Sequence, residues 1–302
     1  MSVTPGVRPR TRRDPKKSPW RYVAIAVILF LALSLADVAL TNPNFGWSVV
    51  GQYLFSAVIL NGLLLTLELT ALVMIIGSVL GVLLAIMRTS SNAFVARSAW
   101  AYVWFFRGTP LLIQVIFWFN IAALFPEIEL AVPFGPTLVG FDANALITPW
   151  TAAVLALSLN EGAYMAEIVR GGLLGVDRGQ YEAAQALGMR PNKVFQIIMP
   201  QAVRTIIPPT ANQLVTTFKN TALVSVIGLA DLLHSAQVVY ALNYQTIPLL
   251  IVAAFWYLLL TSLLSYVQAL LERKYSKGYA PRSRPQARTE SVVAKSAVAK
   301  EV

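Results

Sequence analysis

The sequence predicts an all-α integral membrane protein with six transmembrane helices, and three observations support this fold class. Hydrophobic residues make up 57% of the 302 residues and charged residues only 13%, whereas a soluble domain has about 25% charged residues. Several apolar runs reach the roughly 20 residues that a helix needs to cross the hydrocarbon core. Lysine and arginine gather in alternate loops and in the two tails, as expected for a chain that crosses a membrane repeatedly.

The predicted crossings differ in their polarity and in their small residues. They cover residues 22–40, 62–87, 100–125, 149–170, 210–227 and 247–271. The first could also be a cleaved signal peptide, but its apolar run is longer than a typical signal core, which favours a retained helix. The second contains Gly77 and Gly81, whose spacing favours close helix contact. Pro208 and Pro209, just before the fifth, are expected to break or tilt its entry.

The charges indicate which side of the membrane each segment faces. Residues 1–21 and 276–302 are expected to be disordered tails, and the basic first tail could touch anionic lipid. With six crossings, both tails lie on the same side as the polar stretch 179–209, and every lysine and arginine except Lys219 lies there or at that boundary. This side is therefore the cytoplasm. The net charge of +10 reflects this topology, and no nucleic acid partner is expected.

The loops on the opposite side contain no lysine or arginine. Residues 125–148 are rich in proline and glycine and predict an outer loop, and residues 229–246 predict another, which includes Asp231 and His234.

Several kinds of catalytic site are missing from the sequence. There is no cysteine and only one histidine, His234, so neither thiolate chemistry nor a zinc site is expected. No G-x-x-x-x-G-K-[ST] phosphate-binding loop occurs, and neither H-E-x-x-H nor G-x-S-x-G is present. The sequence therefore predicts a chain that is not an enzyme and that draws its energy from another polypeptide or from an ion gradient.

The polar, helix-prone stretch 179–209 must face water between the fourth and fifth crossings. Glu182, Ala183 and Ala184 favour a helix, Gly188 can end it in a left-handed conformation, and Pro191 prevents its continuation. A face formed by Ala183, Ala184 and Gly188 would let a partner surface approach closely. Glu182 would offer that partner one polar contact.

These residues resemble the membrane-spanning permease subunits of binding-protein-dependent ATP-binding cassette importers, in the branch that takes up polar amino acids. The resemblance extends from the motif Glu182-Ala183-Ala184 and Gly188 to Ile198 and Pro200. It also includes Arg107-Gly108-Thr109-Pro110 and the run 163–171, AYMAEIVRG. The distance from Gly188 to Pro200 is one residue shorter than in the family pattern, and Met199 replaces a leucine.

The resemblance covers about residues 61–275 and implies a type I importer permease fold, with a five-helix core and here one extra amino-terminal helix. Residues 179–200 would be the coupling loop that docks on a separate ATPase subunit, and that partner would bind ATP, so this chain needs no cofactor. The resemblance also implies an extracytoplasmic substrate-binding protein and a second permease subunit, identical or a sibling. The expected location is a bacterial cell membrane, with both termini in the cytoplasm.

Polar side chains inside the predicted crossings are the candidate pathway residues, because polar groups are costly in lipid. Glu161 and Lys219 could receive the ammonium and carboxylate of an amino acid, or they could pair with each other or with other helices and hold the helices packed. The remaining candidates could line the cavity or join helices: Tyr164, Asn212, Thr216 and Asn220. Gln213 and Thr217 lie on the adjoining helix face. Glu167 and Arg170 are expected to form a local salt bridge.

The alternative function is a secondary amino acid carrier driven by an ion gradient, with Glu161 or Glu68 as its proton site. Such carriers usually contain internal repeats, and the sequence shows no convincing repeat. For Glu68, an interhelical hydrogen bond is the favoured role.

Overall fold

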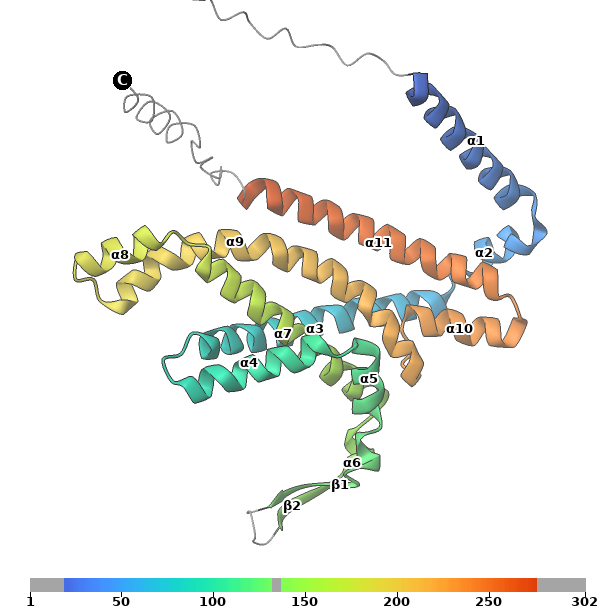
Figure 1. Ribbon diagram of the computed structural model, residues 1–302. Coiled ribbons are helices and arrows are strands. Elements are labelled where there is room, and N and C mark those ends of the chain that lie inside the picture. Colours follow the sequence, from blue (N-terminus) through green and yellow to red (C-terminus); the bar gives the residue numbers. More distant parts are fainter. Residues whose placement is uncertain (1–18, 132–136, 276–302) are drawn as a thin grey trace, which may run out of the picture.

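The computed structural model describes residues 19–131 and 137–275, and these are almost entirely helical (Figure 1). Four helices are long and apolar enough to cross a membrane: α1 (Pro19–Thr41), α3 (Ala57–Arg88), α7 (Pro149–Leu174) and α11 (Thr246–Tyr275). One bent pair joins α4 (Ala93–Gly108) to α5 (Leu111–Phe119) at 101°. A second joins α9 (Pro191–Asn220) and its 3-10 continuation η3 (Thr221–Ile227) to α10 (Leu232–Asn243) at 42°. Counting each pair as one crossing gives the six predicted crossings and confirms the fold class.

Short elements connect these helices. They are η1 (Pro43–Phe45), α2 (Trp47–Tyr53), η2 (Ile121–Ala123), α6 (Ala143–Leu146) and α8 (Arg178–Ala186). In Figure 1, α8 lies at one end of the bundle, beyond the end of α7 and beside the first turns of α9, and α10 lies towards the opposite end.

Helices α3 and α7 pack closely at the centre of the fold. A Cβ atom on Gly77 would come within 2.5 Å of Glu161 Cγ, and one on Gly81 within 2.4 Å of Met165 Cβ. Nearer the α10 end of α3, Leu69 and Val73 pack against alanines of α7 in one apolar cluster. The close contact predicted from the small-residue spacing of Gly77 and Gly81 is confirmed.

Replacing Gly81 with alanine should destabilise the protein, because the new methyl group overlaps the main chain and side chain of Met165. Overpacking of this kind costs about 1–3 kcal/mol. Gly171→Ala is the matched control in α7, since a Cβ there meets nothing within 4 Å. Thermal melting of the detergent-purified variants should show a lower Tm for Gly81→Ala alone. Equal melting of both variants would contradict the close packing.

Helix α1 projects away from the other helices (Figure 1), and none of its most apolar window is buried. Trp47 connects it to the core, because its Nε1 donates a hydrogen bond to the Ala39 carbonyl at 2.8 Å. The exposed surface of α1 is apolar and can face lipid or another subunit.

The stretch 125–148 is not only a loop, because it contains an antiparallel hairpin of β1 (Glu127–Ala131) and β2 (Thr137–Asp142). The prediction missed these strands because the prolines and glycines between and around them resemble a loop. Residues 127–130, EIEL, nevertheless alternate between acidic and apolar residues, as a strand does. The hairpin projects from the helical bundle in Figure 1.

The stretch 229–246 is also not a loop, because most of it forms α10. Asp231 is fully buried, and its carboxylate accepts hydrogen bonds from the backbone N–H groups of Leu233 at 3.3 Å and His234 at 2.9 Å. Tyr257 of α11 donates to the same carboxylate at 3.2 Å. Asp231 is thus an N-cap that starts the helix, and His234 lies in this helix instead of in a loop.

The predicted break at Pro208 and Pro209 is wrong, since α9 continues through both residues. Proline within a membrane helix is tolerated where neighbouring helices support it. Here α7 supplies that support. A Cβ on Gly172 would lie 2.2 Å from Ile206 Cγ1, and Thr205 Oγ1 donates to the Gly172 carbonyl at 3.2 Å.

Candidate functional site

A polar cavity lies between α4, α5, α7 and α9. It consists of three adjoining hollows of about 420, 400 and 480 Å³, and Arg107 and Tyr164 line all three. One hollow extends towards α3 and Arg88, and another towards Gly175 and Thr205. A hollow of this size can hold a small polar molecule.

The sharp turn between α4 and α5 places Arg107 at this cavity. Proline has no N–H and disfavours a helical conformation in the residue before it, and here Thr109 is extended before Pro110. Gln114 Nε2 secures the turn by donating to Thr109 Oγ1 at 2.7 Å and to the Phe106 carbonyl at 2.9 Å. All four residues of the element 107–110 line the hollow of about 400 Å³.

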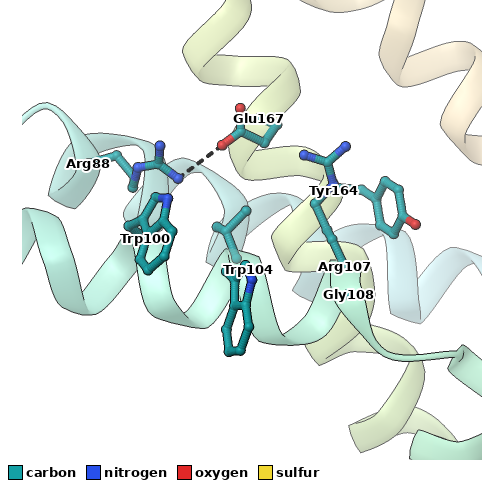
Figure 2. A pocket seen from close by; sticks show the side chains of 8 residues that line it. Arg88, Trp100, Trp104, Arg107, Gly108, Tyr164 and Glu167 are labelled. Atoms are coloured by element: carbon teal, nitrogen blue, oxygen red, sulfur yellow. Dashed lines mark hydrogen bonds and ion pairs between the residues drawn. The ribbon is translucent and has the colours of Figure 1, made fainter.

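The Arg107 guanidinium lies over the Tyr164 ring, 5.2 Å from its centroid (Figure 2). Such a cation–π contact holds the side chain while leaving its N–H donors available. Arg107 is exposed, so a bound anion can reach these donors.

Glu167 is neutralised by two arginines at the edge of the cavity. The predicted salt bridge to Arg170 is confirmed, and Arg170 Nε donates to Glu167 Oε2 at 3.1 Å. Arg88 of α3 adds a second ion pair at 3.0 Å, drawn as a dashed line in Figure 2. Sequence reasoning missed Arg88, because nothing in the local pattern shows a contact between residues 79 positions apart.

Four predicted pathway residues line the cavity, and two do not. Tyr164, Asn212, Thr216 and Asn220 are among the lining residues. Glu161 and Lys219 are not. Glu161 is only 3% exposed and contacts α9, where its Oε2 accepts from Gln213 Nε2 at 3.0 Å and from Thr217 Oγ1 at 2.7 Å.

The predicted alternative has two parts, and the structure contradicts one of them: Glu161 and Lys219 do not pair with each other, whereas Glu161 does bond to another helix, α9. Glu161 Oε1 is buried without a hydrogen-bond partner in the described part of the chain, and Lys219 is exposed. Glu161 meets the face of α9 that carries Gln213 and Thr217. Lys219 lies two residues beyond Thr217, and residues two apart do not share a helix face.

Gln213 is one of the lining residues that sequence reasoning did not select. It borders two of the hollows and also contacts Glu161. Its position in the polar run from Asn212 to Asn220 was a usable signal, but the periodicity alone did not separate it from residues that join helices.

The stretch 179–200 forms the predicted short helix, which ends at Gly188, and a second helix follows it. The N–H of Gly188 donates to the Gln185 carbonyl at 2.9 Å, and that of Met189 donates to the Ala184 carbonyl at 3.0 Å. These two bonds form a Schellman motif, and Gly188 has the left-handed φ of +61° that the motif needs. Helix α9 then begins at Pro191.

The predicted small-residue face is only partly present. Glu182, Ala183 and Gly188 are exposed, but Ala184 is 3% exposed and faces the protein. The reason is that Ala184 lies three residues after Tyr181, whose hydroxyl donates to the Leu173 carbonyl at 3.2 Å and so fixes the inner face of α8. Leu187 is 78% exposed instead and adds an apolar side chain to the outer surface.

Comparisons with known proteins agree with this geometry. The family described as "binding-protein-dependent transport system inner membrane component" matches residues 77–277. The arginine transport system permease protein ArgU of Corynebacterium glutamicum is 42% identical over 268 residues, which are 87% of this chain and 83% of that protein. The L-cystine transport system permease protein TcyB of Bacillus subtilis is 37% identical over 233 residues, 76% of this chain and 92% of that protein.

A solved structure is also similar. The crystal structure described as an amino acid ABC transporter with histidines is 36% identical, with a TM-score of 0.61 over 72% of this chain and 94% of that chain. The cavity, the helix–turn–helix of residues 179–200 and these matches lead to one conclusion: this chain belongs to the family of inner membrane components of binding-protein-dependent transport systems.

Proposed function

We propose that this chain is the permease subunit of an ATP-driven importer for polar amino acids. The observation that supports it most strongly is that the same two helices, α7 and α9, both line the cavity and flank α8. They supply most of the hollow around Tyr164, Gly172, Thr205 and Asn212, and they also flank α8 in the chain. A force applied to α8 therefore reaches the walls of the cavity through two continuous helices.

The amino acid class follows from the cavity and the relatives. Arg107 offers N–H donors to a carboxylate, and the surrounding amides and hydroxyls offer hydrogen bonds to polar groups. The two relatives are named for the transport of arginine and L-cystine. A polar amino acid is the substrate that fits both.

The partners in this proposal are two ATPase subunits, which bind ATP, an extracytoplasmic substrate-binding protein and a second permease subunit. The exposed residues Glu182, Ala183, Leu187 and Gly188 are the ATPase-docking surface. ATP-driven closure of the ATPase subunits moves α8 and switches the paired permeases from outward-facing to inward-facing.

Proteoliposomes test this function against the ion-gradient carrier. Uptake of a labelled amino acid should require the ATPase subunits and internal ATP, and it should survive an uncoupler that collapses the proton gradient. Uptake without the ATPase that stops with the uncoupler would favour the carrier. Glu68, a possible proton site for that carrier, is exposed on α3 and forms no interhelical hydrogen bond in the described part of the chain.

The orientation of the chain gives a separate prediction. A cysteine introduced at Gln185, which is exposed on α8, should react with an impermeant maleimide only after the cytoplasmic side is opened. The chain has no other cysteine, so the labelling reports this site alone. The control is a cysteine at Tyr244, which is 89% exposed at the end of α10 and should react from outside intact cells. The reverse pattern would place α8 outside the cytoplasm.

A further inference from the structure

Three polar side chains around Arg107 share one hydrogen-bond polarity. In the hollow of about 400 Å³, Asn160, Gln213 and Thr216 direct hydrogens into the protein. Asn160 Nδ2 donates to the Phe106 carbonyl at 2.8 Å and to Gln114 Oε1 at 3.3 Å. Because a carbonyl oxygen can only accept, this orientation of the Asn160 amide is fixed. The group that Asn160 has left for a ligand is its amide oxygen.

Thr216 and Gln213 also direct their hydrogens into the protein. Thr216 Oγ1 donates to the Asn212 carbonyl at 3.1 Å, which leaves the hydroxyl lone pairs as acceptors. Gln213 Nε2 donates to Glu161 Oε2 at 3.0 Å. Glu161 Oε2 also accepts from Thr217 Oγ1 at 2.7 Å. With Nε2 directed at this oxygen, the Gln213 amide keeps its own oxygen for the cavity.

Glu161 is held in place for this role. A Cβ on Gly77 would lie 2.7 Å from Glu161 Cβ as well as 2.5 Å from its Cγ, so the side chain lies directly against the α3 backbone. Thr217 donates to the same Oε2 that Gln213 contacts. The carboxylate has no cationic partner, since its other oxygen is buried without a hydrogen bond within the described residues. Glu161 therefore influences the cavity through its hydrogen bond with Gln213.

We propose, building on the proposed function, that this cavity prefers amino acids with a donor-rich cationic side chain, and that Glu161 is a positioning residue that sets the preference through Gln213. Arg107 receives the substrate carboxylate. The oxygens of Asn160, Gln213 and Thr216 receive N–H groups of a guanidinium or ammonium. Glu161 itself does not touch the substrate.

The test compares L-arginine with L-citrulline, which has nearly the same shape but carries a neutral ureido oxygen in place of one N–H donor group. Binding is measured by equilibrium dialysis with the purified permease–ATPase complex, without the substrate-binding protein, so that the selectivity belongs to this chain. The wild type should bind arginine about ten- to hundredfold more tightly than citrulline. With citrulline a charge-assisted hydrogen bond is lost, and the ureido oxygen faces an acceptor oxygen of the cavity. A ratio near one in the wild type would overturn the proposal.

Glu161→Gln keeps the shape of the side chain but lets Gln213 turn either way. The arginine-to-citrulline ratio should fall about tenfold, while the elution volume of the complex stays unchanged. Ser158→Ala is the control, because Ser158 lies one turn before Glu161 on α7 and borders a separate apolar groove. That variant should keep the wild-type ratio.

Other outcomes separate this proposal from the proposed function. If Glu161→Gln keeps the wild-type ratio, the positioning role is wrong but the importer remains. If Glu161→Gln does not assemble, Gln213→Leu replaces it as the test variant, because Gln213 is the half-buried member of the Glu161–Gln213 pair. An unchanged arginine-to-citrulline ratio in Gln213→Leu also overturns the proposal. If the wild-type complex neither binds nor transports any amino acid, the proposed function itself is wrong.

Discussion

Gly188→Trp should abolish ATP-driven uptake while leaving the chain inserted in the membrane. Gly188 lies at the tip between α8 and α9, and a Cβ placed there meets nothing within 4 Å. A tryptophan side chain would therefore meet no interior atom and would project from the surface that docks on the ATPase, although it also strains the left-handed backbone of the turn. Uptake and substrate-stimulated ATP hydrolysis in proteoliposomes should fall at least about tenfold, the change that follows from losing about 1.4 kcal/mol of docking free energy.

The left-handed backbone at Gly188 must be separated from the effect of bulk. Its φ of +61° costs most residues other than glycine roughly 1–2 kcal/mol, whereas asparagine adopts it readily. Gly188→Asn should therefore keep the turn and most of the uptake, and Gly188→Val should lose both. Full uptake by the tryptophan variant would show that this tip does not meet the ATPase.

Most of the fold could be predicted from the sequence because the membrane restricts the possibilities. Only helices satisfy their backbone hydrogen bonds in lipid, so apolar length identified α3, α7 and α11 directly. The left-handed Gly188 and the end of α8 before Pro191 followed from local backbone chemistry. In contrast, α10 was missed because its N-cap, Asp231, is buried by tertiary contacts with α11 that a single sequence does not reveal.

The site was predicted less completely, for a similar reason. Helical periodicity gave Tyr164, Asn212, Thr216 and Asn220, which all line the cavity. Periodicity does not show which polar residues face each other across helices. It therefore leaves a pair of Glu161 with Lys219 open as one alternative, whereas Glu161 contacts Gln213 and Thr217. Pairing depends on the rotation of α9 against α7, which packing at Gly172 and Ile206 decides.

Arg107→Ala should raise the half-saturation concentration for uptake about ten- to hundredfold. Arg107 lines every part of the polar cavity and holds the cation–π contact with Tyr164. Its removal takes away charge-assisted hydrogen bonds of about 1.5–3 kcal/mol, and each 1.4 kcal/mol corresponds to about a tenfold change. The maximal rate per assembled complex should change less, because α8 and its docking surface are untouched. The measurement is uptake at a series of substrate concentrations with the complete transporter.

Two variants decide whether position or charge causes the effect. Arg97→Ala removes an exposed cation from the same helix, α4, that does not line these hollows, and it should leave the half-saturation concentration unchanged. Arg107→Lys keeps the charge but loses the planar fork that binds a carboxylate through two parallel hydrogen bonds. The half-saturation concentration of Arg107→Lys should therefore lie between those of the wild type and of Arg107→Ala. If Arg97→Ala weakens uptake as much as Arg107→Ala, the net charge of α4 matters and Arg107 is not the carboxylate contact.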